Sequence, residues 1–367
     1  MTLSVSNRSA SAAAPMQRIH GGPDASGVPR FDFSTNSNAC GPCPLALAAV
    51  QQAEPSHYPD ASYAQLRAQL AAFHGVEVGR VLLAGSASEF IFRITARVAR
   101  EGGRQVCLPL HAYGDYAQAA LAWGLSPIAE PDEAQLVWAC EPSSPLGAAH
   151  TAWPKWLGEQ GAKHDGFPAS VQVEPLVRNP IDGIEGPAGK FFSPMVLDCA
   201  YAPLRLSGTP TLTEEQLAQV WQLWTPNKAL GLTGVRAAYV IAPLGAQSMV
   251  AALECLCPSW PVGAHGVAML QSWMQPEVQA WLAQSLLTLR EWKARQITLL
   301  QDLGWTCLPS DTNFFCARPG QVFDLNCLRA AGIKLRDITS FGLSGHVRVS
   351  VQAPGAQDAL ALALQGR

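Results

Sequence analysis

The pattern of hydrophobic and polar positions alternates between two periods along most of the chain. Segments with apolar residues three or four positions apart, typical of amphipathic helices, alternate with short apolar runs typical of buried strands. The helical segments are 62–75, 88–101 and 113–124, and the strand-like runs are 80–85, 105–110, 134–140 and 194–201. This alternation predicts an α/β fold in which helices cover both faces of a parallel or mixed sheet. In such sheets ligands bind at the carboxyl ends of the strands.

The pattern changes in the second half of the chain. A long helical stretch at 276–304 precedes short strand-like runs, a mixed segment at 328–336 and a terminal amphipathic segment at 355–366. The stretch from 158 to 193 is rich in Gly and Pro and predicts loops. We predict a flexible tail (1–17), an N-terminal segment that packs with the small domain (18–50), a large cofactor-binding domain (51–255) and a small α+β domain (256–367).

Composition narrows the class of protein. A chain of 367 residues favours two domains. A net charge of −3 gives no reason to expect nucleic acid or an anionic membrane as a partner. No apolar run is long enough to span a bilayer, and the first residues lack the apolar core of a signal peptide. Ten cysteines without a repeated spacing favour a reducing compartment and no metal site. We therefore expect a cytoplasmic enzyme that acts on a small molecule.

The most informative stretch is "WTPNKALGLTGVR", which contains Lys228 and Arg236. Asp198 and Tyr201 lie upstream, at the end of a predicted strand. These four residue types in this order suit pyridoxal 5'-phosphate. A lysine amine forms a Schiff base with the aldehyde, and an aspartate keeps the pyridine nitrogen protonated. A tyrosine hydroxyl donates to the ring oxygen O3′, and an arginine pairs with the phosphate.

With these motifs in order, the sequence resembles fold-type-I pyridoxal-phosphate enzymes of the class I/II aminotransferase superfamily. The closest likeness is to the branch of histidinol-phosphate aminotransferase and L-threonine-phosphate decarboxylase. It extends from about His20 to the C-terminus. The resemblance implies an aspartate aminotransferase-like fold with a large and a small domain, pyridoxal 5'-phosphate as cofactor, and a homodimer with composite active sites.

The resemblance also assigns roles around the cofactor. Lys228 would form the Schiff base, with Asp198 and Tyr201 as catalytic partners. The usual "NPNNPTG" motif appears here as "CEPSSPLG", so Ser144 stands where an asparagine normally binds O3′. One neutral hydrogen bond is worth about 1 kcal/mol, so cofactor binding is still expected. The other expected cofactor contacts are Ala87 and Ser88 in a strand–turn–helix, Tyr113 stacked on the ring, Thr225 and Arg236 on the phosphate, and Tyr58 from the neighbouring subunit.

On the substrate side, the resemblance assigns Arg348 to the α-carboxylate and Arg336 to a phosphate. The "HGG" at 20–22 resembles the decarboxylase segment that folds over the substrate phosphate, although a flexible turn would look the same. The expected substrate contacts there are His20, Gly21 and Asn36, with Asn38 as the alternative to Asn36. We therefore expect an L-threonine-O-3-phosphate decarboxylase-like lyase of cobalamin biosynthesis. The alternative is an aminotransferase of the histidinol-phosphate type that uses a 2-oxo acid.

Two other classes of function remain open. The first is a non-catalytic ligand sensor with this fold. The second is a dithiol oxidoreductase, because "CGPC" at 40–43 precedes a helix that would begin at Pro44. A thioredoxin-like site follows a βαβ pattern, and the fewer than forty residues before Cys40 are mostly polar. The redox hypothesis predicts that serine at positions 40 or 43 removes activity and that Lys228→Ala is harmless, whereas the cofactor hypothesis predicts the reverse.

Overall fold

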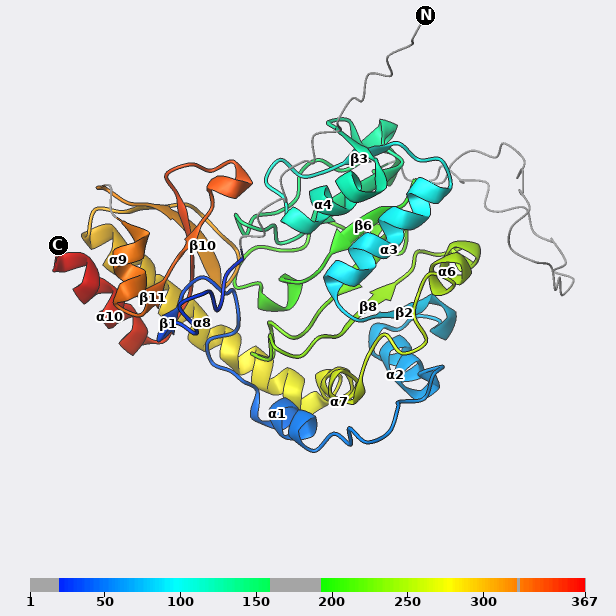
Figure 1. Cartoon of the computed structure of the whole chain (residues 1–367), viewed down its shortest axis with the longest axis horizontal. Helices are drawn as coiled ribbons and strands as arrows, with labels where there is room; N and C mark the ends of the chain where they lie inside the picture. Colours follow the sequence, from blue (N-terminus) through cyan, green and yellow to red (C-terminus); the bar gives the residue numbers. More distant parts are fainter. Residues whose placement is uncertain (1–19, 159–192, 322–323, 367) are drawn as a thin grey trace, which may run out of the picture.

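A large mixed sheet, a smaller antiparallel sheet and a long helix that runs between them organise the computed structural model (Figure 1). The structure describes residues 20–158, 193–321 and 324–366. The predicted tail at 1–17 and nearly all of the Gly- and Pro-rich stretch after residue 158 lie outside these residues. No helix in the described parts of the chain is long and apolar enough to cross a membrane.

The large sheet has seven strands in the order β2-β8-β7-β6-β5-β3-β4. Neighbours from β7 to β4 are parallel, whereas β8 runs antiparallel to both β7 and β2. Strands β2, β5, β6 and β8 are buried along their whole length, as expected for a sheet covered on both faces. The strands are β2 (Val81–Ala84), β3 (Gln105–Cys107), β4 (Ser126–Ile128), β5 (Leu136–Cys140), β6 (Met195–Asp198), β7 (Trp221–Trp224) and β8 (Ala238–Ile241).

Helices follow the strands as the hydrophobic pattern predicts. Ser86 begins α3 because its hydroxyl accepts the backbone N–H of Glu89, and Gly75 ends α2 in the left-handed conformation at φ +63°. Figure 1 shows α3 and α4 side by side on one face of the sheet. The helices of this part are α2 (Ala64–His74), α3 (Ala87–Arg100), α4 (Gly114–Trp123), α5 (Glu214–Leu217) and α6 (Gln247–Glu254), with 3-10 turns at Val78–Arg80, Pro131–Glu133, Lys155–Leu157 and Ala202–Leu204.

The second sheet is antiparallel and has the order β12-β13-β10-β9. It packs with the long helix α8, which begins at Pro276 and shares one apolar core with β10 and β13. Its elements are α8 (Pro276–Asp302), β9 (Thr306–Cys307), β10 (Phe314–Arg318), α9 (Leu325–Ala330), β12 (Arg336–Asp337), a 3-10 turn (Thr339–Phe341), β13 (Val347–Ser350) and α10 (Pro354–Gln365).

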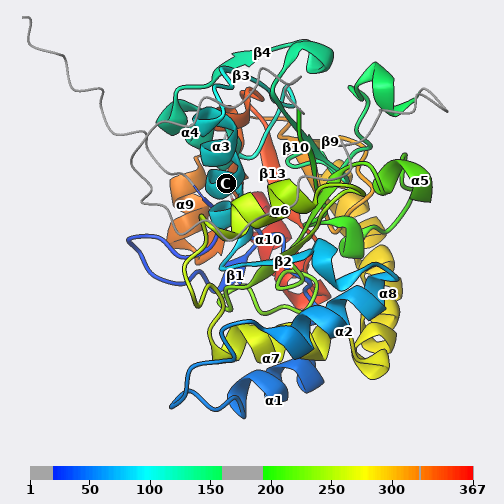
Figure 2. The same ribbon diagram turned by 90° about the vertical axis from the view of Figure 1, so that its right-hand side faces the viewer.

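The N-terminal segment connects the two parts of the molecule. Strand β1 (Phe31–Asp32) pairs in parallel with β11 (Ile333–Lys334), beside the small sheet. The backbone N–H of Asn38 then donates to the carbonyl of Lys228, which lies beyond the large sheet. Helix α1 (Pro44–Gln51) begins at Pro44, as predicted, and packs on α7 (Ala264–Trp273) (Figure 2). The segment therefore passes directly over the carboxyl ends of the central strands.

Candidate active site

Lys228 lies in the loop after β7, and the loop is held in place by its own side chains. Thr225 donates its hydroxyl to Asn227 Oδ1 at 2.9 Å, and the Asn227 amide donates to the carbonyls of Thr233 and Val235. Lys228 itself is half-buried, with Nζ 5.3 Å from the centroid of the Tyr201 ring. The lysine therefore projects from a fixed loop toward the end of the neighbouring strand β6.

Asp198 ends β6 and is 5% exposed. Its Oδ2 accepts the Tyr116 hydroxyl at 2.6 Å, and its Oδ1 accepts the Ala200 backbone N–H at 2.9 Å. Burial raises the pKa of Asp198, while both hydrogen bonds and the charge of Lys228 act in the opposite direction. Tyr116 is itself fixed by stacking on Trp138 at 4.4 Å. The sequence analysis missed Tyr116, whose one local signal is its position on α4, three residues after Tyr113.

Tyr201 lies three residues beyond Asp198 and is 7% exposed. Its hydroxyl oxygen accepts the Asn36 side-chain amide at 3.1 Å, and its ring meets the Phe314 ring edge to face at 4.8 Å. The two predicted residues Asn36 and Tyr201, which are 165 positions apart in sequence, are therefore in direct contact.

The turn between β2 and α3 places Ala87 and Ser88 at the first two positions of a fourteen-residue helix. Backbone N–H groups at such a start favour an anion. The Ser88 hydroxyl lies 3.3 Å from the hydroxyl of Tyr113, the residue that precedes α4. Burial raises the pKa of Tyr113, so this phenol keeps its proton at neutral pH. Tyr113 thus stands between the start of α3 and Asp198, its ring 5.8 Å from that of Tyr116.

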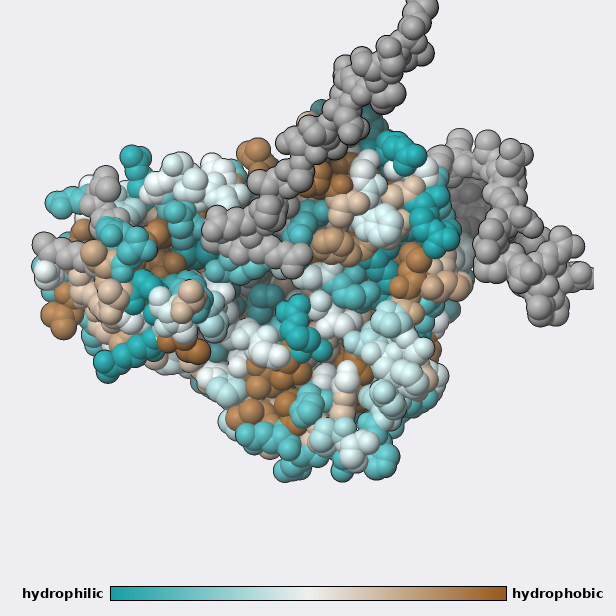
Figure 3. All heavy atoms as spheres, in the orientation of Figure 1, coloured by the Kyte–Doolittle hydropathy of each residue, from teal (hydrophilic) through white to brown (hydrophobic). Residues whose placement is uncertain are grey.

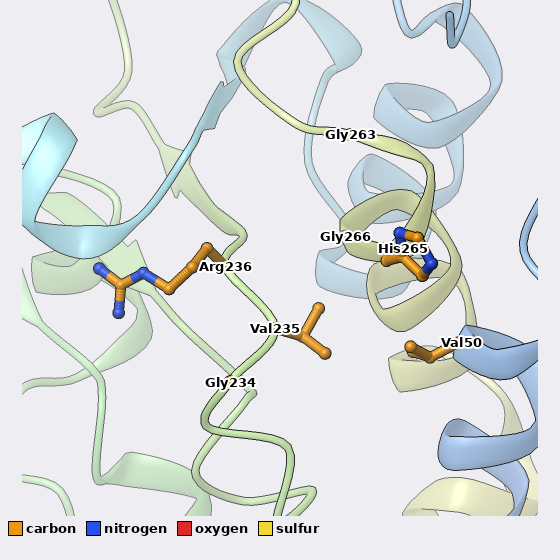
Figure 4. A pocket seen from close by; sticks show the side chains of 7 residues that line it. All are labelled: Val50, Gly234, Val235, Arg236, Gly263, His265 and Gly266. Atoms are coloured by element: carbon orange, nitrogen blue, oxygen red, sulfur yellow. The ribbon is translucent and has the colours of Figure 1, made fainter. Parts of the chain in front are cut away.

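Arg236 is exposed and lies just before β8, at the edge of a cavity of about 300 Å³. Figure 4 shows its guanidinium pointing away from this cavity and from His265. The cavity is lined by Val50, Gly234, Val235, Arg236, Gly263, His265 and Gly266. The backbone of Arg236, but not its charged group, therefore shapes the cavity.

Arg336 and Arg348 face each other directly on the paired strands β12 and β13. They are 6% and 7% exposed. Burial, followed by the charge of Arg348, lowers the pKa of Arg336. Arg348 donates to the Ser144 hydroxyl at 3.3 Å and to the Ser34 carbonyl at 3.1 Å, while its Nε is buried without a hydrogen-bond partner. Two like charges opposite each other destabilise a sheet, which points to an anionic ligand between them.

The loop that contains Ser144 is anchored by Glu141, a residue that the sequence analysis did not single out. Glu141 accepts Arg205 Nη2 and the Thr211 backbone N–H, each at 2.9 Å, as well as the Thr211 hydroxyl. The Glu141 side chain is only 4% exposed. Glu141 therefore ties the loop after β5 to the loop after β6, and so fixes Ser144 beside Arg348.

The "HGG" segment lies at the same site. The His20 ring centroid is 6.2 Å from that of Tyr113. Gly22 donates its N–H to the Ser34 hydroxyl at 2.8 Å, and its carbonyl accepts Lys334 Nζ at 2.6 Å. A Cβ on Gly21 would lie 2.2 Å from the Ser34 carbonyl oxygen, so only glycine fits there.

Two predicted features do not join this group of residues. Tyr58 is 78% exposed and stacks on Trp260 at 4.5 Å. Asn38, the alternative to Asn36, donates to the Ala229 carbonyl and the Ser285 hydroxyl and has a structural role. Tyr58 can contribute only to the active site of a second chain, packed against this surface.

The "CGPC" segment lacks the properties of a redox-active pair. All ten cysteines lie in the described residues and are free thiols. Cys43 is completely buried, and burial raises the pKa of Cys40, which disfavours the reactive thiolate. A Cβ on Gly41 would lie 3.0 Å from the Cα of Gly231. The segment therefore serves to pack the N-terminal loop against the lysine loop.

Comparisons with known proteins agree with this geometry. The sequence model of the family "aminotransferase class I and II" matches residues 195–365. Histidinol-phosphate aminotransferase 1 of Thiobacillus denitrificans is 27% identical over 345 residues, covering 88% of this chain and 81% of that protein. The structure of histidinol-phosphate aminotransferase from Sinorhizobium meliloti, in complex with pyridoxal-5'-phosphate, has a TM-score of 0.68 at 21% identity, covering 90% of this chain and 89% of that one. L-threonine-O-3-phosphate decarboxylase from Porphyromonas gingivalis has a TM-score of 0.61 at 18% identity, covering 87% and 91%.

The fold is that of fold-type-I pyridoxal-phosphate enzymes, with a seven-stranded mixed sheet and a small antiparallel sheet. The residues around Lys228 suit this cofactor, because a buried carboxylate, a buried phenol and a helix start surround the lysine, and Asn36 Oδ1 and Arg348 Nε are buried there without partners. Residues 195–365 match the class I and II aminotransferase family, the chain is similar to its histidinol-phosphate aminotransferases over most of its length, and it is a pyridoxal-phosphate-dependent enzyme.

Proposed function

We propose that the protein transfers an amino group between a phosphorylated substrate of the histidinol-phosphate type and a 2-oxo acid. The observation that carries this proposal is the buried pair Arg336 and Arg348. Two opposed guanidinium groups suit a phosphate or a carboxylate, since each guanidinium offers a planar fork of donors. The named relatives that act on histidinol phosphate support amino transfer as the reaction.

Lys228 is the residue that we assign to the cofactor aldehyde. Bound pyridoxal phosphate supplies an electron sink that stabilises negative charge at the substrate Cα. With the cofactor bound, Asp198 would hold the pyridine nitrogen in its protonated form, and Tyr201 would donate its hydroxyl to the ring oxygen. The Lys228 amine would move the proton at the substrate Cα.

The phosphate of the cofactor belongs, in this proposal, at the start of α3. The backbone N–H groups of Ala87 and Ser88 point to that position, and Thr225 and Arg236 come from the two sides of the lysine loop. Thr225 now donates its hydroxyl to Asn227. Binding of the phosphate therefore requires that this hydroxyl turn from Asn227 to the phosphate oxygen.

A second candidate, decarboxylation of L-threonine O-3-phosphate, is favoured by the N-terminal segment. Asp24 forms an ion pair with Arg329 and Lys334, and Lys334 also holds the Gly22 carbonyl. These contacts hold His20 next to Tyr113, where it covers the substrate side of the site. Such a cover suits a reaction in which the carboxylate is held away from water until carbon dioxide leaves.

We also propose a homodimer with composite active sites. Tyr58 and Trp260 form an exposed aromatic pair, and Leu45 on α1 is 53% exposed. Figure 3 shows apolar side chains gathered on the lower part of the molecule, over the region of α1 and α7. A second chain that covered this surface would bury the aromatic pair and bring Tyr58 to the neighbouring cofactor phosphate.

One single-turnover experiment tests the reaction. The cofactor-loaded protein is mixed with histidinol phosphate alone, and the visible absorption of the bound cofactor is followed before and after addition of 2-oxoglutarate. Amino transfer predicts that the absorption disappears and then returns with the 2-oxo acid. The same protein is then mixed with L-threonine O-3-phosphate, and carbon dioxide is measured.

Release of carbon dioxide with full return of the absorption, and no change with histidinol phosphate, would replace the first proposal by the second. No response to either compound contradicts the phosphorylated substrate class. Arg336→Met is the matched control, because it removes one guanidinium of the pair and leaves Lys228 and Asp198 untouched. We expect this variant to keep the cofactor absorption and to lose the response to the phosphorylated compound.

A further inference from the structure

The side chain of Asn36 reaches the centre of the cofactor site from outside the large sheet. Its Nδ2 donates to the Tyr201 hydroxyl oxygen at 3.1 Å, and its Oδ1 is buried without a partner. Asn36 is 2% exposed, so this amide lies away from bulk solvent. Burying an amide that makes one hydrogen bond, here to a phenol, costs folding free energy. This cost suggests that the hydrogen bond serves the phenol.

The backbone around Asn36 is fixed from both sides. Phe33 donates its N–H to the Lys334 carbonyl, and Asn38 donates its N–H to the Lys228 carbonyl. The Phe33 side chain is fully buried between these two points. Because one end is bound to β11 and the other to the lysine loop, the backbone that carries Asn36 cannot move away from Tyr201 without breaking these attachments.

Ser144 cannot supply the amide that the family normally places at its position. Its hydroxyl is short, and it already accepts Arg348 Nη1 at 3.3 Å. The ring oxygen of the cofactor therefore receives no amide N–H from position 144 in this chain. Asn36 is the amide that can replace this asparagine indirectly, because it bonds Tyr201, the residue assigned as donor to the ring oxygen.

We propose that Asn36 is a positioning residue that strengthens Tyr201 as the donor to the cofactor ring oxygen and so compensates for the asparagine missing at position 144. A phenol oxygen that accepts an N–H becomes a stronger donor through its own proton, because hydrogen bonds in a chain polarise one another. The Asn36 amide also fills one acceptor site of the phenol, which leaves the Tyr201 proton to point at the ring oxygen. This inference rests on the assignment of the cofactor to Lys228 and is independent of the substrate.

The consequence appears in the bound cofactor before any substrate is added. When the lysine–cofactor linkage loses its proton, the ring oxygen carries more negative charge, and a stronger donor stabilises that form. In Asn36→Leu, which keeps the side-chain size and removes the amide, we expect the midpoint of the pH titration of the visible absorption to move to higher pH. The midpoint should shift by about three- to tenfold in proton concentration, which is the effect of one hydrogen bond.

A double-mutant cycle with Tyr201→Phe shows whether the effect passes through the phenol. We expect Asn36→Leu to move the midpoint less than twofold when Phe replaces Tyr201. Asn313→Leu is the matched control, because Asn313 is fully buried and donates its side-chain amide to the Ser37 carbonyl, whereas Asn36 donates to Tyr201. It should leave the midpoint unchanged.

Asn36→Asp is a second variant, which serves if Asn36→Leu does not fold. A carboxylate there would accept the Tyr201 proton and divert it from the cofactor, so the midpoint should again rise. An unchanged midpoint in Asn36→Leu or Asn36→Asp, or an equal shift in the Tyr201→Phe background, overturns the inference. A wild-type protein that shows no visible absorption with the cofactor contradicts the Lys228 assignment itself, and this inference with it.

Discussion

The buried ion pair between Glu141 and Arg205 gives a stability prediction whose size follows from its contacts. The two side chains are 4% and 12% exposed, and the charged groups are 2.9 Å apart. Arg205→Met removes the positive partner and leaves a buried carboxylate. Breaking such a pair on one side costs about 3–5 kcal/mol. Thr211 continues to donate twice to the carboxylate, so we expect the lower end, about 3 kcal/mol.

Adding Glu141→Gln to Arg205→Met should restore part of the lost free energy of unfolding. Glu141→Gln removes the uncompensated charge but keeps a carbonyl oxygen that accepts the Thr211 N–H. We therefore expect the double variant with Arg205→Met to be destabilised by about 1–2 kcal/mol, less than Arg205→Met alone. This sign, in which a second mutation stabilises, is specific to a buried charge pair.

The assay is urea unfolding followed by tryptophan fluorescence, with the free energy of unfolding taken from the midpoint and the slope. The exposed pair Arg97 and Glu101 provides the control, because its side chains are 27% and 39% exposed. Arg97→Met should cost less than about 1 kcal/mol. If Arg205→Met costs no more than Arg97→Met, or if the double variant is less stable than Arg205→Met, the reasoning about Glu141 is wrong.

Further predictions concern a half-buried histidine, the arginine assigned to the substrate and the two cysteines of "CGPC". Burial lowers the pKa of His74 from 6.5 to about 4, so the unfolded chain takes up its proton first and the free energy of unfolding falls as the pH drops from about 6.5 to 4. The fall is at most about 3 kcal/mol, and pH-dependent urea midpoints should show a shallower fall in His74→Gln. Arg348→Met should keep the cofactor absorption and raise KM about 10- to 100-fold, and an unchanged KM contradicts its role. Cys40→Ser and Cys43→Ser should keep cofactor uptake and turnover, and loss of turnover alone would revive a thiol function.

Much of the fold is predictable because local patterns specify the elements. The apolar run at 80–85 and the helical period at 88–101 predicted β2 and α3. The sequence did not reveal that β8 runs antiparallel to its neighbours, because a strand buried on both faces has the same apolar pattern in either direction. Chain direction within a sheet depends on distant connections, which a local window does not contain.

The site divides in the same way. Lys228, Asp198 and Arg348 follow from motifs, each placed by its own loop or strand. Asn36 was expected as a substrate contact, but Tyr116 and the contact between Asn36 and Tyr201 were not predicted, because these hydrogen bonds join positions 82 and 165 residues apart. Nothing near either residue in the sequence indicates the partner, and only the packed structure brings the two side chains of each pair together.

The residue to which the cofactor is covalently attached decides whether Lys228 has the role assigned to it. The loaded protein is reduced with borohydride, digested, and examined by mass spectrometry, with Lys228→Ala as the matched control. The account predicts one phosphopyridoxyl group per chain, on the peptide that contains Lys228, and none in the variant. Attachment to a different lysine, or equal labelling of Lys228→Ala, would contradict it.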